Sequence, residues 1–315
     1  MEVLPALYPK QPPDRGPTVV IREFYSDKLG LSNEFCHNPI YRGICDRNSR
    51  ATIHYMKKQT FMNVTCQKTG NTLLHVVMVE ASPITETKYV PFVYQLSYAG
   101  VNFDAVNKKG ERPIKLAIKM HLLELMVALI KCGATCHVDE DMDLITSVSG
   151  PVEYEFRNAY RKFCPGYWLP VEEDKAFKVN VLVKSWCRIN IQRDDKTLIE
   201  FAKESGAQNK IVKMLIQNEN SIEFAHATIA GDEDRMVTLL QHYSVDLETK
   251  DYSHKENFFD VYSPLTLYGA AIKYGHKHIL PLLKNSGKYS VRLNNNDSAS
   301  GNSEGPYAST VCTIL

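Results

Sequence analysis

Residues 107–134 read NKKGERPIKLAIKMHLLELMVALIKCGA: a polar turn with a glycine, two apolar segments and a closing Cys-Gly-Ala. The spacing of the apolar residues in the two segments predicts a pair of helices. Neither helix would have enough polar surface to be stable alone in water. We therefore expect this unit to be one of several that bury their apolar faces against each other.

The chain of 315 residues is 44% hydrophobic, which is typical of a folded protein with a core. Its 37 basic and 36 acidic residues nearly cancel, so no global positive charge would attract nucleic acid. The sequence shows no secretory signal and no run of about 18 apolar residues that could span a membrane. We therefore expect a cytoplasmic protein whose 8 cysteines are reduced.

Apolar pairs at the ends of successive second helices give the chain a repeat. The first members of these pairs lie 33, 53, 33, 24 and 43 residues apart. Two equal intervals predict a unit of 33 residues, and the other intervals imply insertions or a shortened link. The pairs are Leu96-Ser97, Leu129-Ile130, Leu182-Val183, Leu215-Ile216, Leu239-Leu240 and Leu282-Leu283.

These units resemble the ankyrin repeat family. TGNTLLHVV (69–77) is similar to the family's turn and first helix, including Thr72, Leu74 and His75. GERPIKLAI (110–118) is a looser match, and the unit at 169–190 is identified mainly by its register. The pattern returns in DKTLIEFAKESG (195–206), FAHATIAGDEDRMVTLLQHYSVDLETKD (224–251) and YSPLTLYGAAIKYGHKHILPLL (262–283).

The resemblance covers roughly residues 66–289 and implies an all-α fold, an ankyrin-like α-solenoid of about six helix-pair units with irregular insertions and flexible termini. Such units would stack in sequence order around one elongated core. The resemblance also implies that His75, His276 and His278 make hydrogen bonds within or between units.

Composition divides the chain into four segments. Residues 1–30 are rich in proline and are expected to be flexible, and residues 31–65 form a candidate N-terminal capping segment. Residues 66–289 form the repeat domain, and residues 290–315 form a polar, flexible tail.

Three stretches of the repeat domain do not fit the period of the repeat. They lie near residues 80–88, 137–163 and 253–262. Insertions in a solenoid project from one edge and often contact partners, although a loop of tolerated length is the alternative.

The chain ends Val-Cys-Thr-Ile-Leu, which resembles the C-a-a-X prenylation box with Cys312 as the lipid attachment site. The terminal Leu315 favours a geranylgeranyl group, and a prenyltransferase would then be a partner. One lipid chain without a polybasic run binds membranes reversibly, so we expect conditional, peripheral association with an intracellular or plasma membrane. A coincidental cysteine is the alternative.

Two motifs resemble functional sequences but lack the context that these need. GNSEG (301–305) fits the G-x-S-x-G pattern of a serine nucleophile, yet it lies in the polar tail without a strand before it or a helix after it. Residues 139–143 begin like a calcium loop, but Leu144 replaces the required glycine and Gly150 replaces the bidentate glutamate. The sequence therefore indicates no catalytic residue and no cofactor.

The cysteines offer two candidate zinc sites. Cys132 and Cys136, next to His137, have the spacing of half a tetrahedral site, but the chain has no second pair at a standard spacing. A looser N-terminal cluster is irregularly spaced and comprises Cys36, His37, Cys45, His54 and Cys66. We therefore predict no metal site, and we expect Cys132 to be a packing residue.

The resemblance to ankyrin repeats implies that hairpin tips and first helices bind protein partners. The candidate residues are Lys108, Lys109, Glu111 and Arg112 in the second unit, Gln192, Arg193, Asp194 and Asp195 between the third and fourth, and Lys250, Asp251 and Tyr252 near the fifth. Each could also be a solvated turn residue. Asn190, with Leu182 eight residues earlier, is a candidate for the asparagine hydroxylation that the family often carries.

We therefore expect a noncatalytic protein–protein interaction module, a scaffold or adaptor that a C-terminal lipid would tether to a membrane. One alternative is a substrate adaptor of a ubiquitin ligase, which would need a ligase-binding box after the repeats. Another is a thiol- or zinc-dependent enzyme built on Cys36, Cys45 and Cys66.

Overall fold

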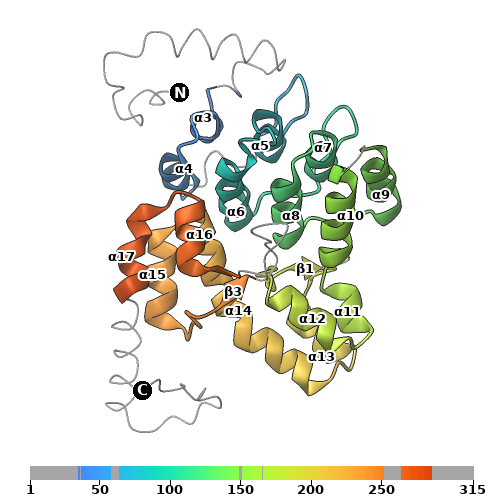
Figure 1. Cartoon of the computed structure of the whole chain (residues 1–315), viewed down its shortest axis with the longest axis vertical. Coiled ribbons are helices and arrows are strands. Elements are labelled where there is room, and N and C mark those ends of the chain that lie inside the picture. Colours follow the sequence, from blue (N-terminus) through green and yellow to red (C-terminus); the bar gives the residue numbers. More distant parts are fainter. Residues whose placement is uncertain are drawn as a thin grey trace.

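The apolar pairs that define the repeat lie in helices, and the predicted, predominantly helical fold is confirmed. The computed structural model describes residue 35 and residues 37–57, 64–148, 151–164, 166–251 and 264–285. These residues form 15 α-helices, two 3-10 helices and two antiparallel sheets of two strands each (Figure 1). The segments 1–30 and 290–315, including Cys312, lie outside the described residues.

The first half of the chain forms a row of helix pairs (Figure 1). In each pair the first helix packs in one layer and the second helix packs in the other, because each helix buries one apolar side against its neighbours. The pairs are α3 (Pro39–Cys45) with α4 (Ser49–Met56), α5 (Leu73–Glu80) with α6 (Val90–Tyr98), α7 (Pro113–Lys119) with α8 (Leu123–Lys131), and α9 (Val138–Ser147) with α10 (Pro151–Phe163).

The candidate capping segment contributes the first pair of this row. Asn38 begins α3 by accepting hydrogen bonds from the backbone N–H groups of Ile40 at 2.8 Å and Tyr41 at 3.2 Å. The helices α3 and α4 then pack against α5 and α6. Residues 37–57 therefore belong to the same two layers as the repeats that follow.

The expectation that residues 137–163 project as an insertion is wrong. These residues form α9 and α10, a complete helix pair that packs on α7 and α8. Phe156 and Tyr160 of α10 are 1% exposed, so the helix has an apolar face of its own. The interval of 53 residues in the sequence therefore contains an additional, shortened unit.

The second half of the chain forms a second row, which lies below the first in Figure 1. Its central element is the long helix α14, which packs on α12, α13, α15 and α16. The helices of this row are α11 (Trp168–Glu172), α12 (Ala176–Val183), α13 (Leu198–Glu204), α14 (Asn209–Ala230), α15 (Glu233–His242), α16 (Leu267–Lys273) and α17 (Leu280–Asn285).

Helix α14 is shared by two consecutive units. The apolar pair Leu215-Ile216 was expected at the end of a second helix, but it lies in the middle of α14, which continues to Ala230. The helix therefore pairs first with α13 and then with α15. This continuity explains the short interval of 24 residues in the repeat.

The two rows do not extend in single file, so the expectation of one elongated core in sequence order is wrong. The second row turns back, and α14 packs against α6 of the first row. The side-chain amide of Gln95 donates to the backbone carbonyl oxygen of Ala230 at 2.7 Å. The hydroxyl of Tyr98 donates to the backbone carbonyl oxygen of Glu223, also at 2.7 Å. Buried apolar residues from both rows form one continuous core.

Two short hairpins connect helices of the second row. Strand β1 (Gln192–Arg193) pairs with β2 (Lys196–Thr197). Asp194 and Asp195 between these strands have φ values of 52° and 60°, as in the type I′ turn that two-residue hairpins favour. Strand β3 (Lys250–Asp251) pairs with β4 (Leu265–Thr266), and the predicted insertion at 253–262 lies outside the described residues.

The other predicted insertion, at residues 80–88, connects α5 to α6. It contains Ile84, whose side chain is 95% exposed, and ends in the 3-10 helix η2 (Glu86–Lys88). A second 3-10 helix, η3 (Lys277–Ile279), precedes α17.

The predicted histidine contacts are present. The His75 ring lies 2.9 Å from the carbonyl oxygen of Glu111 in the next unit, and its Nδ1 accepts from the backbone N–H of Thr72 at 3.1 Å. The rings of His276 and His278 contact the carbonyl oxygens of Ile229 at 2.8 Å and Gly231 at 3.1 Å. These side chains tie consecutive units together.

In the part of the chain that the structure describes, no helix combines the length and the apolar character needed to cross a bilayer.

Candidate binding site

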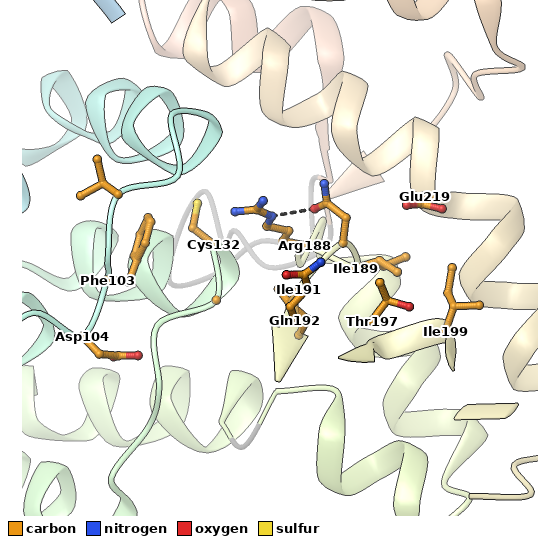
Figure 2. Close-up of a pocket in the computed structure, with 13 residues that line it drawn as sticks. Phe103, Asp104, Cys132, Arg188, Ile189, Ile191, Gln192, Thr197, Ile199 and Glu219 are labelled. Atoms are coloured by element: carbon orange, nitrogen blue, oxygen red, sulfur yellow. Dashed lines mark hydrogen bonds between the residues drawn. The ribbon is translucent and has the colours of Figure 1, made fainter. Parts of the chain in front are cut away.

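A cavity of about 590 Å³ lies where the two rows meet (Figure 2). Val101, Phe103 and Asp104, from the loop after α6, line one side together with Cys132 and Gly133, which follow α8. The opposite side comes from the second row. It consists of Arg188, Ile189, Asn190, Ile191, Gln192, Thr197, Ile199 and Glu219. The cavity therefore exists only because the second row turns back onto the first.

Arg188 connects the two sides of the cavity. One guanidinium nitrogen donates to the Ser97 hydroxyl of α6 at 2.7 Å, and Nε donates to Oδ1 of Asn190 at 2.6 Å (Figure 2). The backbone N–H of Arg188 also donates to the carbonyl oxygen of Lys131, at 2.8 Å. Arg188 therefore fixes the segment 188–191 against the first row.

Glu219 is the acidic group at the far side of the cavity (Figure 2). It lies on α14 and is half-buried, and burial raises the pKa of its carboxyl group. No described side chain forms a hydrogen bond or an ion pair with this carboxylate, whereas Asp104 accepts from the backbone N–H and the hydroxyl of Thr135 at 3.0 and 2.7 Å. Glu219 is therefore available to a cationic group that enters the cavity.

Part of the remaining lining is apolar, and the rest includes the polar residues Asn190, Gln192 and Thr197. Phe103 and Ile189 are buried, and Ile191 and Ile199 are partly exposed to the cavity. The cavity therefore combines this apolar surface with two carboxylates, those of Asp104 and Glu219, and with the guanidinium of Arg188.

The β1–β2 hairpin lies beside this cavity. Its predicted partner-binding residues Gln192, Arg193, Asp194 and Asp195 are all exposed, and Gln192 lines the cavity. The guanidinium of Arg193 lies 5.9 Å from the centre of the Trp168 ring. The predicted hydroxylation candidate Asn190 is exposed and lines the same cavity, and its hydroxylation stays a prediction.

The predicted residues of the second unit have different environments. Lys108 and Lys109 are exposed, and Glu111 is half-buried and paired with Lys119 at 2.7 Å. Arg112 is only 5% exposed. It binds Asp141 at 3.0 Å, so its assignment to a partner surface is wrong.

The assignment of Asp251 to a partner surface is also wrong. Its carboxylate is 1% exposed and lies 2.7 Å from the ammonium of Lys131, the last residue of α8. Lys250 is half-buried. Tyr252 lies outside the described residues.

The cysteine residues do not assemble a metal site within the described ranges, where no group of three or more His, Cys, Asp or Glu side chains could hold a metal ion. Cys132 is buried against α6, and burial raises the pKa of its thiol to about 12. Cys136 lies in the loop between α8 and α9, and Cys164 is the first residue after α10. Cys36 is outside the described residues.

The predicted site residues do not include Arg188, Ser97 or Glu219, which form or support the cavity. The sequence gives a weak indication that Arg188 has a specific role, because it is a single charge between the apolar residues Cys187 and Ile189. The sequence gives no such indication for Glu219, because other polar residues surround it in its helix.

No protein-family model matches the chain, and comparison with curated proteins finds no similar sequence.

Proposed function

We propose that this chain is a noncatalytic protein-binding module with ankyrin-like units. Two observations support the ankyrin-like character: the helix pairs of the first row pack in two layers, and His75 links one unit to the next. The observation that carries the binding function is the exposed β1–β2 hairpin beside a cavity that contains Glu219.

The chemistry of the cavity favours an extended partner segment with a basic side chain flanked by apolar ones. A lysine or arginine would pair with Glu219, and apolar neighbours would contact Phe103, Ile191 and Ile199. Repeat modules use such surfaces to bind extended peptides.

A library of random peptides displayed on phage tests this function. We expect selection on the full-length protein to enrich peptides with one basic residue between apolar residues. Glu219→Lys should weaken the binding of these peptides by about tenfold or more, because like charges then meet in the cavity. Fluorescence anisotropy with a selected, labelled peptide measures this change.

Glu172→Lys is the matched control, because Glu172 is exposed on α11 and does not line the cavity. It makes the same change in net charge and should leave the affinity unchanged. Failure to enrich any peptide, or equal affinity for Glu219→Lys and wild type, would contradict the proposed function.

We further propose that the tail carries a prenyl group on Cys312. The proposal rests on the sequence of the last four residues. A fluorescently tagged chain should move from membranes to the cytosol when Cys312 is replaced by Ser. An unchanged distribution would contradict the lipid and leave the binding function unaffected.

A further inference from the structure

The cavity between the two rows contains a cation as well as the carboxylate of Glu219. Arg188 lines the same cavity and is half-buried. Figure 2 shows its guanidinium on the side of Cys132, whereas Glu219 lies on the opposite side. A ligand that bridges the cavity would therefore meet one positive group and one negative group.

The guanidinium of Arg188 donates only to neutral groups. Its acceptors are the hydroxyl of Ser97 at 2.7 Å, the backbone carbonyl oxygen of Ser97 at 3.4 Å and Oδ1 of Asn190 at 2.6 Å. Among the described residues, no carboxylate lies within ion-pair distance of this guanidinium. Because a half-buried charge without a counter-ion has lost part of its hydration, an anionic group of a ligand would stabilise Arg188.

The carboxylates of the cavity do not neutralise this arginine. Both carboxylate oxygens of Asp104 accept hydrogen bonds from Thr135, at 3.0 and 2.7 Å. Glu219 lies on the other side of the cavity (Figure 2). The cavity therefore holds two opposite charges, Arg188 and Glu219, and neither is paired with the other.

A second cavity, of about 610 Å³, adjoins the first at Glu219, which lines both. Its lining comes from α14 and from α15 with the residue that follows it, and consists of Glu219, Asn220, Glu223, Arg235, Thr238, Leu239 and Tyr243.

The arginine of the second cavity already has partners. Arg235 forms an ion pair with Glu223, and its guanidinium carbon lies 3.8 Å from the centre of the Tyr98 ring. Arg188 is therefore the arginine that lacks a counter-ion. Because the groove formed by the two cavities continues past Glu219, it suits the middle of an extended chain better than a chain end.

We propose that this groove binds an internal, extended segment of a protein partner that carries an acidic side chain close to its basic one. The inference rests on the proposed function and adds the acidic residue to it. The aspartate or glutamate pairs with Arg188, while the lysine or arginine of the same segment pairs with Glu219. Segments that carry only basic residues would leave Arg188 without a counter-ion and bind more weakly.

The peptides selected on the full-length protein test this inference. We expect the enriched sequences to share an acidic residue as well as a basic one. One such peptide is labelled and compared with a version in which the acidic residue is replaced by its amide. In fluorescence anisotropy, the amide version should bind the wild-type protein about fivefold more weakly or worse, because it lacks the charge that pairs with Arg188.

The variant Arg188→Gln shows whether this preference depends on Arg188. Its side-chain amide can still donate to Ser97, but it carries no charge. We expect the variant to bind the acidic and the amide peptide with equal affinity. Arg50→Gln is the control, since Arg50 is exposed on α4 and lines neither cavity, and it should keep the full preference. If Arg188 only supports the fold, Arg188→Gln weakens both peptides by the same factor, and this result would overturn the proposal.

A measurement on the wild-type protein decides the question if Arg188→Gln does not fold, as circular dichroism would show. A photo-crosslinking group replaces the acidic residue of the peptide, and mass spectrometry maps the attachment point. We expect labelling at Arg188 or at its neighbours in the first cavity, Cys132 and Gly133. Labelling elsewhere would overturn the proposal.

The result also separates this inference from the proposed function. Selected peptides that need their basic residue but bind equally well with the acid or its amide would support the proposed function and overturn the role of Arg188.

Discussion

The ammonium of Lys131 lies 2.7 Å from the carboxylate of Asp251, and the two side chains are 2% and 1% exposed. Lys131 ends α8 in the first row, and Asp251 lies in β3 of the second. The pair therefore joins the two rows in the interior of the protein. The Lys131 ammonium also lies 5.4 Å from the centre of the Phe163 ring.

Removing one member of this pair should be strongly destabilising. Asp251→Ala leaves a buried ammonium without its carboxylate, and we expect the free energy of unfolding to fall by about 3–5 kcal/mol. The double variant Lys131→Met with Asp251→Leu removes both charges and should recover most of this loss. Urea denaturation measures the free energy of unfolding of the single and the double variant. Glu173→Ala, which breaks an exposed pair with Lys175, is the control and should change stability by about 1 kcal/mol or less.

Gly231 should tolerate no side chain. It ends α14 with a φ of 74°, and a Cβ there would lie 2.5 Å from Nδ1 of the His276 ring. We expect Gly231→Ala to lower the free energy of unfolding by about 3 kcal/mol, from backbone strain and the clash together. Gly206→Ala has nearly the same φ, 73°, but open space around the Cβ, and should cost about 1 kcal/mol. Equal losses in thermal unfolding would contradict the contact with His276.

The buried histidines should make the fold sensitive to acid. Burial lowers the pKa of His226 to about 3 and of His276 to about 4, whereas both groups titrate near 6.5 when unfolded. Because the folded-state pKa values are depressed, their stabilisation is present above pH 6.5 and is lost as the pH falls towards 4. Each histidine should contribute a slope of about 1.4 kcal/mol per pH unit in this range.

The slope of stability against pH, measured by urea denaturation between pH 5 and 6, tests these histidines. His226→Gln can still donate to the carbonyl oxygen of Trp186, which the His226 ring contacts at 2.6 Å, but it does not titrate. We expect its slope to decrease by about 1.4 kcal/mol per pH unit relative to wild type. An unchanged slope would show that His226 does not stay neutral in the fold.

Glu86 should act in the opposite direction. Its carboxylate accepts from the backbone N–H groups of Glu124 at 2.9 Å and Leu125 at 3.3 Å, yet burial raises its pKa to about 7. With the folded-state pKa raised, its stabilisation is present below about pH 4.5 and is lost as the pH rises to 7. Glu86→Gln should therefore raise the free energy of unfolding at pH 8 by about 2–3 kcal/mol.

The control for Glu86→Gln is Glu233→Gln, an exposed change in the first turn of α15. It should alter stability by no more than about 0.5 kcal/mol. A loss of stability in Glu86→Gln at pH 8 would mean that the charged carboxylate is the better cap of α8.

Local patterns predicted much of the helical framework and part of the site. The apolar pairs at Leu96, Leu129 and Leu182 lie in second helices, and the four residues predicted at a hairpin tip are exposed: Gln192, Arg193, Asp194 and Asp195. The 33-residue period gave a wrong prediction for residues 137–163. A unit shorter than 33 residues looks like an insertion when the other units are aligned on that period. The period also gave a wrong helix end at Leu215. Helix α14 belongs to two consecutive units, so no turn marks the boundary between them.

Charged residues were the least predictable. Arg112 and Asp251 lie in polar turns and looked like surface residues, but each is buried against an oppositely charged residue far away in the chain. Arg188 and Glu219 line the cavity for the same kind of reason, because elements distant in sequence pack around them.

The sequence by itself determined most of the segments that become helices and which side of each is apolar, because both depend on residues only a few positions apart. The tertiary structure decided that the second row turns back onto the first, and with it the cavity and the Lys131–Asp251 pair. An apolar stripe requires burial but does not specify a partner. The partner is selected by shape and by hydrogen bonds between segments far apart in the chain, such as Gln95 with Ala230.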